Sequence, residues 1–335
     1  MCVDRKTLLR CMVFGATAIC CVTGSTRASP PPPPSPDLVA AVDAASCGSQ
    51  HDTPAPEAIP VKVSPLSPEP IVESVKGTVT WRWGYHLASG DSRVGNITGL
   101  TIDEKFGIIA MTANRHWLIL DYGTKDGIAA VKAIGLAPMR GAPGRPTSIA
   151  FTLHWQLVSF PDQNIVQRYS LSTCGTAAVG LPVFTIAGQP PVTVLTEAAA
   201  DYVALVGQDE TGIKNTLMLP REQQTVTIRR HDIPALAGYR LVALANGTKI
   251  VPYIFALWAT PGHNAVLQLM YVPLWGDFWG PNANTQTVPV KVAEFSRTPT
   301  GMTAFFNRKT GHTGMVLTFD TGPGSVDIVS IDIKQ

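Results

Sequence analysis

Residues 97–121, ITGLTIDEKFGIIAMTANRHWLILD, contain the pattern that decides the fold. Residues 98–103 are rich in β-branched and apolar side chains and predict a strand, which the turn-forming sequence starting at Glu104 separates from a second strand over 107–112. A third strand is predicted over 117–121. Three short strands joined by tight turns favour an antiparallel sheet whose strands are neighbours in the sequence.

The opening strand of this unit has counterparts along the rest of the chain. Similar strands begin near residues 147, 192, 239 and 298, a spacing of 45 to 59 residues. After about residue 77 there is no long apolar pattern with helical periodicity, so crossover helices between the strands are not expected. A repeat of this length made of strands alone is typical of a β-propeller. We therefore predict an all-β fold over residues 73–335.

Two further predicted strands, 78–86 and 326–334, lie near the ends of this domain and belong to no unit of their own. Pairing them in one blade would close the ring and leave no exposed sheet edge. Five units plus this closing blade predict six blades, with five as the alternative.

The first 72 residues are expected to lie outside the propeller. Residues 1–28 predict a signal peptide, because a basic start precedes an apolar stretch over 11–22 that is too short to cross a bilayer. A lipid anchor at Cys20 or Cys21 and an uncleaved anchor are the alternatives. Residues 29–72 contain 12 prolines and predict a disordered tether, or else an unselected leader. We expect an exported protein, periplasmic or secreted, without a membrane span in the mature chain.

Charge and cysteine content exclude several classes of function. A formal net charge of +2 over 335 residues is too small to indicate nucleic-acid binding. Four of the six cysteines lie in the predicted signal peptide, which leaves Cys47 and Cys174. In an oxidising compartment this pair predicts a disulfide, with two unpaired thiols as the alternative. The absence of a C-x-x-C sequence argues against thiol-redox and zinc-ribbon functions.

Three stretches give the chain a resemblance to a known family. Residues 97–103 (ITGLTID), 117–121 (WLILD) and 157–178 (LVSFPDQNIVQRYSLSTCGTAA) resemble the esterase-like activity of phytase family of exported bacterial proteins. The resemblance covers about residues 78–334 and implies a propeller. It also implies a metal-assisted ester or phosphoester site, which requires several carboxylates around hard cations such as Ca²⁺.

The chain departs from the acidic positions of that family at several predicted turns. Where members usually carry acidic residues, this chain has Thr147-Ser148, Pro161, 299–301 (PTG) and 307–309 (NRK), and Asn114-Arg115-His116 replaces an Asp-Arg-Gly-like turn. We therefore expect a retained fold with a degenerate acidic site, without a bound metal or cofactor. The predicted function is a binding or assembly module of the cell envelope with an envelope protein as partner, and enzymatic activity is not expected.

The alternative is a metal-assisted ester or phosphoester hydrolase with a rearranged site, in which Ca²⁺ would be the cofactor. Its catalytic candidates are His116, His154 and Asp162. The two histidines precede Trp117 and Trp155 in similar positions of two units. They would bind a metal or an anion together with the binding candidate Arg115, or they would simply pack against the tryptophans.

A second candidate binding region is the sequence LWGDFWGPNAN over 274–284. Its aromatic residues Trp275, Phe278 and Trp279 stand among glycine, proline and asparagine, so they are expected in a loop. Exposed aromatic side chains in a loop are suitable anchors for a protein partner. The alternative is that the loop folds its own aromatic side chains onto the propeller.

Overall fold

In the computed structural model the chain forms two compact units, residues 1–31 and residues 32–335. All described residues belong to the second unit. The structure describes residues 47, 55–68, 78–103, 107–121, 127–151, 155–185, 191–199, 202–209, 212–220, 238–246, 253–271, 290–307 and 311–334. The predicted signal peptide, including Cys20 and Cys21, and most of the predicted tether therefore lie outside the described residues. No described helix is long and apolar enough to cross a membrane.

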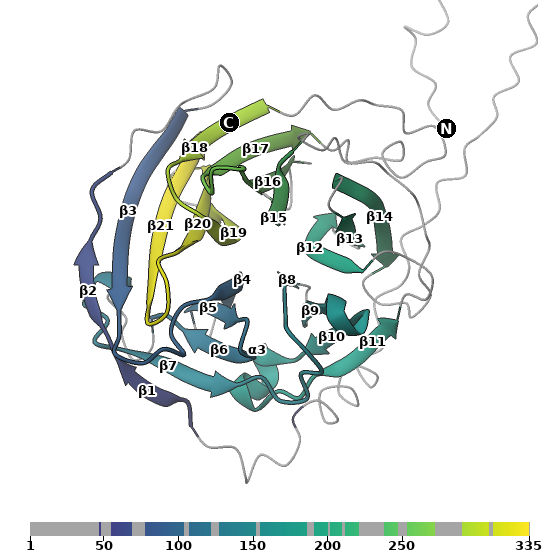
Figure 1. The fold of residues 1–335 in the computed structure, drawn as a ribbon, viewed down its shortest axis with the longest axis horizontal. Helices are drawn as coiled ribbons and strands as arrows, with labels where there is room; N and C mark the ends of the chain where they lie inside the picture. Colours follow the sequence, from purple (N-terminus) through teal and green to yellow (C-terminus); the bar gives the residue numbers. More distant parts are fainter. Residues whose placement is uncertain are drawn as a thin grey trace, which may run out of the picture. The chain divides into compact units, whose positions relative to one another are not determined.

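The described strands form five antiparallel sheets arranged as the blades of a propeller (Figure 1). The innermost strands are β4 (Ile97–Asp103), β8 (Ser148–Phe151), β12 (Val192–Ala199), β15 (Arg240–Asn246) and β19 (Pro299–Asn307). Each inner strand contacts the inner strand of the next sheet, and β19 returns to β4, so the inner strands form a closed ring. The predicted β-propeller fold is confirmed.

The other strands follow outward from these inner strands, mostly in sequence order. The first sheet continues with β5 (Gly107–Thr112), β6 (His116–Ile119), β7 (Ala133–Pro138) and β1 (Glu57–Pro60). The second continues with β9 (Gln156–Phe160), β10 (Ile165–Tyr169) and β11 (Leu181–Thr185), and the third with β13 (Tyr202–Asp209) and β14 (Gly212–Pro220). The fourth contains β16 (Tyr253–Ala259), β17 (Ala265–Tyr271) and β18 (Val290–Phe295), and the fifth contains β20 (His312–Asp320), β21 (Ser325–Lys334), β3 (Thr78–Ala88) and β2 (Lys62–Pro65). Short helical turns are η2 (Ile128–Ala130), η3 (Pro161–Gln163), α3 (Leu171–Cys174) and η4 (Gly175–Ala177).

The two ends of the domain meet in the fifth sheet. Strand β21 pairs with β3 from Ser325 opposite Ala88 to Lys334 opposite Thr78, which confirms the predicted pairing of the terminal strands. The prediction of six blades is not confirmed, since the described strands form five sheets, the number given as the alternative. The reason is that β19 is the inner strand of the sheet that β21 and β3 complete, so the fifth unit and the closing blade are one blade.

Part of the predicted tether belongs to the propeller. Residues 57–65, here called the N-terminal strap, form β1 on the outer edge of the first sheet and β2 on the outer edge of the fifth. The prediction of a disordered tether over 29–72 is therefore wrong for this segment. Pro60 and Pro65 stand at the ends of the two short strands, and edge strands tolerate proline because a missing N–H there breaks no ladder bond.

The hydrophobic core lies between neighbouring sheets. Trp117 of the first sheet and Tyr169 of the second are both fully buried and meet edge to face, with ring centroids 5.3 Å apart. Phe295 and Phe319 join the fourth and fifth sheets with their rings tilted at 51° and their centroids 5.5 Å apart. Each buried side chain of this size contributes about 1.5–3 kcal/mol by leaving water, so these contacts hold the blades in their ring.

A disulfide fastens a second point of the N-terminal region to the propeller. Cys47 is bonded to Cys174 at the end of α3, across a sequence separation of 127 residues, and both side chains are buried. A cross-link that closes so long a loop restricts the unfolded chain strongly. The segment before the strap is therefore anchored to the second sheet.

Candidate functional site

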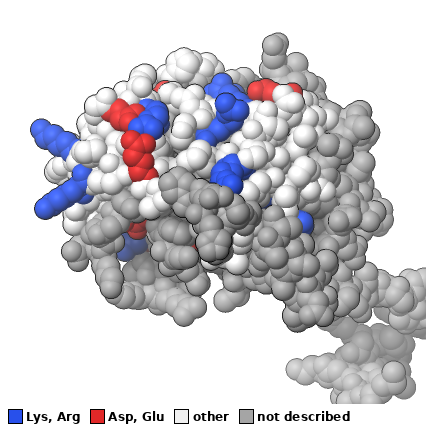
Figure 2. Space-filling view, turned by 90° about the horizontal axis from the view of Figure 1, so that it is seen from below, with Lys and Arg blue, Asp and Glu red and all other residues white. Residues whose placement is uncertain are grey.

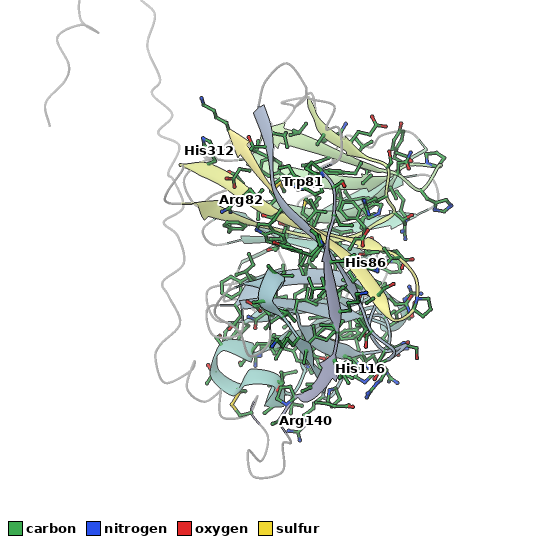
Figure 3. All side chains as sticks on the ribbon, turned by 90° about the vertical axis from the view of Figure 1, so that its left-hand side faces the viewer. Trp81, Arg82, His86, His116, Arg140 and His312 are labelled. Carbon is green, nitrogen blue, oxygen red and sulfur yellow. A yellow bond between two sulfur atoms is a disulfide. The ribbon has the colours of Figure 1, made fainter. Side chains whose placement is uncertain are left out.

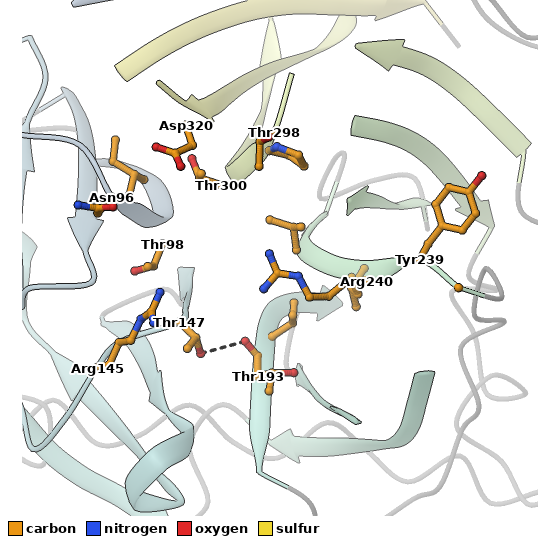
Figure 4. Close-up of a pocket in the computed structure, with 16 residues that line it drawn as sticks. Asn96, Thr98, Arg145, Thr147, Thr193, Tyr239, Arg240, Thr298, Thr300 and Asp320 are labelled. Carbon is orange, nitrogen blue, oxygen red and sulfur yellow. Dashed lines mark hydrogen bonds between the residues drawn. The ribbon is translucent and has the colours of Figure 1, made fainter. Parts of the chain in front are cut away.

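A cavity of about 740 Å³ opens at the end of the ring where the five inner strands begin. All five sheets supply lining residues, because every inner strand starts at this same end. Threonine recurs at these starts: Thr98 and Thr193 are the second residues of β4 and β12, Thr147 precedes β8, and Thr298 and Thr300 flank the start of β19. The cavity therefore presents a ring of hydroxyl groups (Figure 4).

Two arginines give the cavity its positive charge. Arg240 is the first residue of β15, and Arg145 belongs to the connection between β7 and β8. Figure 4 shows both side chains pointing into the hollow between the inner strands. Both are exposed, and neither forms an ion pair with a residue that the structure describes. Each guanidinium group is thus available to a ligand that enters the cavity.

Asp320, at the end of β20, is the acidic residue among those that line the cavity in the described part of the chain. Its Oδ1 atom accepts a hydrogen bond of 3.0 Å from the Gly322 amide, which fixes the carboxylate beside Thr300 (Figure 4). With Arg145 and Arg240, this carboxylate leaves a formal charge of +1 on the described lining.

The threonine hydroxyl groups around the cavity differ in the hydrogen bonds that they form. Thr147 Oγ1 donates a hydrogen bond of 3.0 Å to the main-chain oxygen of Thr193 and so links the second and third sheets. Thr300 Oγ1 lies 3.1 Å from Thr318 Oγ1. Thr98 Oγ1 is buried and has no hydrogen-bond partner among the described residues. A buried hydroxyl without a partner is costly.

A second, smaller space lies farther along the inner strands. Its volume is about 120 Å³, and it is lined by aliphatic side chains, among them Leu100, Ile149 and Met302, together with Thr101, Thr196 and Thr303.

The described lining does not suit a calcium ion. Ca²⁺ is held by six to eight oxygen ligands, several of them carboxylates, whereas this cavity has Asp320 and two guanidinium groups. Within the part of the chain that the structure describes, no three histidine, cysteine, aspartate or glutamate side chains are grouped to hold a metal. The residues present therefore do not fit the metal that a phytase-like site would need, and we assign no reaction step to one.

Arg115 and His116 lie at the same end of the first sheet as the cavity but do not line it. Arg115 occupies the turn between β5 and β6 in a left-handed conformation with φ of 63°, and its side chain is exposed. His116, the first residue of β6, lies on the same side of the propeller as His86, whereas His312 lies on the opposite side (Figure 3). Both candidates belong to the rim of this face.

The environment of His116 favours its neutral form. Burial lowers the pKa of the imidazole, and the positive charge of Arg93 lowers it further. Its Nδ1 atom is buried and has no hydrogen-bond partner among the described residues. The group is therefore a neutral imidazole at physiological pH.

The remaining predicted residues are not brought to the cavity. Asp162 lies in η3 between β9 and β10, at the same end of the second sheet, and is exposed. His154 and the aromatic residues Trp275, Phe278 and Trp279 lie outside the described residues. Trp155 is buried, with the Arg168 guanidinium carbon 5.1 Å from the centre of its ring.

The sequence did not identify Arg145, Arg240 and Asp320 as site residues. They are scattered over 176 positions and share no motif, so only the closed ring brings them together. The one signal available was the recurrence of threonine at the start of successive opening strands. On the side shown in Figure 2, the described charged side chains form small mixed groups, so no extended surface of one sign marks that side.

The chain is similar in shape to several solved structures, at low sequence identity. No family model matches the chain, and no curated protein matches it by sequence. Among solved structures, a glutaminyl cyclase from Myxococcus xanthus is 9% identical with a TM-score of 0.43, covering 83% of this chain and 100% of that one. A PQQ-bound aldose sugar dehydrogenase from Streptomyces coelicolor is 13% identical with a TM-score of 0.43 and the same coverage. The nidogen/laminin complex contains a chain 10% identical with a TM-score of 0.41, covering 72% and 84%.

Proposed function

We propose that this chain is an exported, phytase-like β-propeller that has lost its acidic metal site and acts as a binding or assembly module of the cell envelope. The observation that carries the proposal is the lining of the central cavity. Thr147, Pro299 and Thr300 line it at positions where the family resemblance implies acidic residues.

The chemistry of these substitutions argues for binding rather than catalysis. A metal-assisted phosphoesterase needs carboxylates to hold the cations that neutralise the phosphate and activate the attacking water. Threonine hydroxyls and guanidinium groups cannot replace them, but both form reversible hydrogen bonds with a ligand. The cavity thus retains the means of recognition without those of metal-assisted hydrolysis.

Two further features support an exported binding module. The Cys47–Cys174 bond requires an oxidising compartment in a mesophilic cell. The predicted signal peptide provides the route to such a compartment. The partner in this proposal is an envelope protein, with the aromatic segment 274–284 as its predicted contact.

A hydrolase with a rearranged site is the second candidate, favoured by the state of His116. Its imidazole, on the cavity side of the propeller, has a lowered pKa and an Nδ1 atom without a hydrogen-bond partner among the described residues, and a neutral imidazole can act as a general base. Asp162, at the same end of the adjacent sheet, is the acidic residue that would assist it.

One assay separates these proposals. The purified chain is incubated with p-nitrophenyl phosphate or p-nitrophenyl acetate and with Ca²⁺, Mg²⁺, Mn²⁺ or Zn²⁺ in turn. If the chain is a binding module, it should release no more p-nitrophenol than its His116→Ala and Asp162→Ala variants do. Turnover that disappears in either variant, but persists in the surface variant Lys62→Gln, would establish the hydrolase instead.

A further inference from the structure

We propose that the central cavity binds an acidic sugar, a uronate, through its carboxylate and its hydroxyl groups. This inference deepens the proposed binding function by naming the class of ligand, and it rests on that function. It draws on three properties of the described lining: its charge, its hydrogen-bonding groups and its size.

The charge of the cavity fits a ligand with one negative charge. Arg240 extends into the hollow from the fourth sheet and Arg145 from the connection between β7 and β8, and a guanidinium group can bind a carboxylate with two parallel hydrogen bonds. Asp320 lies at the same cavity, and its charge would repel a dianion such as a phosphate monoester. A monocarboxylate bound by a guanidinium group brings one negative charge to a lining whose formal charge is +1.

The hydrogen-bonding groups fit a ligand rich in hydroxyls. A sugar hydroxyl both donates and accepts, so it can donate to the fixed carboxylate of Asp320 and accept from a guanidinium group. The exposed residue Asn96, which precedes β4, lines the same mouth. The ring of threonines therefore surrounds a polar ligand with groups that match its own.

The size and depth of the cavity fit a saccharide of one or a few residues. Its volume of about 740 Å³ lies within the range of about 300–1,000 Å³ typical of small-molecule sites. An end residue of an acidic polysaccharide could enter while the rest of the polymer remained outside.

The test is isothermal titration calorimetry of the purified chain with sodium D-glucuronate, D-glucose, D-glucose 6-phosphate and inorganic phosphate. We expect glucuronate to bind and glucose to bind at least tenfold more weakly. Arg240→Gln and Arg145→Gln should each weaken glucuronate binding by about tenfold to a hundredfold, the effect of losing a charge-assisted hydrogen bond. Lys62→Gln, a matched loss of charge on the outermost strand β2, should leave binding unchanged.

The outcomes distinguish this inference from the function on which it rests. No glucuronate binding, binding unaffected by both cavity variants, or tighter binding of glucose 6-phosphate or phosphate would overturn the uronate proposal. None of these results would support the hydrolase proposal, which the p-nitrophenyl assay tests independently. Thermal unfolding of each variant shows whether the propeller is intact. Arg240→Lys keeps the positive charge but loses the planar guanidinium group, so this variant should bind glucuronate more weakly than the unaltered chain.

Discussion

Arg93 holds Glu57 in a two-point ion pair, with Nη1 2.8 Å from Oε2 and Nη2 2.9 Å from Oε1. The same guanidinium group binds Asp91, with Nη2 2.6 Å from Oδ2. Glu57 is the first residue of β1, whereas Arg93 lies between β3 and β4, so the contact ties the N-terminal strap to the seam between the fifth and first sheets. The strap is also held by Ile59, which is buried in the core between those sheets.

Arg93→Gln should loosen the strap without unfolding the propeller. Exposed ion pairs contribute little to global stability, but this one restrains the first residue of a short strand at the edge of its sheet. We expect faster amide hydrogen exchange over residues 57–65 with an almost unchanged unfolding midpoint. Arg82→Gln removes a comparable ion pair, that with Asp332, and should not alter exchange in the strap. Equal exchange in both variants would contradict the role of Arg93.

Acid should release the strap over a defined range of pH. Hydrogen bonds from Arg93 lower the pKa of Glu57 below its usual 4.5 and that of Asp91 from 3.8 to about 2. A carboxylate whose pKa is lowered by folding stabilises the folded state above its unfolded pKa, and this contribution is lost as the pH falls through the folded pKa. Exchange over residues 57–65, corrected for the intrinsic rate, should therefore accelerate between about pH 4.5 and 2. In Arg93→Gln this acceleration should be absent.

Loss of the disulfide should destabilise the whole domain. Cys47→Ser with Cys174→Ser removes a cross-link between residues 127 positions apart, and such a loss typically costs about 2–5 kcal/mol. The measurement is urea unfolding of the purified double variant beside the unaltered chain. Reduction of the unaltered chain should lower its midpoint by a similar amount. A midpoint that stays constant under both treatments would mean that the bond does not restrict the unfolded chain.

Substitutions at the interface between the first and second sheets should distinguish the contribution of packing to the free energy of unfolding from that of a hydrogen bond. Trp117→Ala leaves a cavity beside Tyr169 and should cost about 3–5 kcal/mol. Tyr169→Phe keeps the ring and removes the hydrogen bond of 2.9 Å from its hydroxyl to Gln167 Oε1, so it should cost about 1 kcal/mol. Denaturant unfolding measures both changes, and a larger loss for Tyr169→Phe than for Trp117→Ala would contradict this assignment.

Local sequence was sufficient to predict three strands of the first blade and the opening strand of each of the others. The turn after Asp103 and the β-branched strands on either side of it specify neighbours in sequence, and the five opening strands all begin within a few residues of their predicted positions. The count of blades depended on a contact between distant segments. Only the structure shows that β19 shares a sheet with β21 and β3.

Neither the strap nor the cavity could be predicted from the sequence, and the two reasons are related. Glu57 and Lys62 stand among prolines, and composition alone cannot distinguish an edge strand from a polyproline tether. Arg240 and Asp320 come from two different sheets and Arg145 from the connection between two others, so these residues line one cavity only when the ring closes. The repeated threonines marked the strand ends, but a β-branched residue at such a place is equally expected from strand propensity.

The pairing of Ser325–Lys334 with Thr78–Ala88 also sets a limit on when the protein can finish folding. During synthesis the first four sheets can assemble in order as they emerge, but the fifth sheet lacks its central strand β21 until residues 325–334 have left the ribosome. Until then β3 has β2 on one side and no partner on the other. A nascent chain therefore carries an open edge of β3 until β21 emerges, a period in which a chaperone would be of most use.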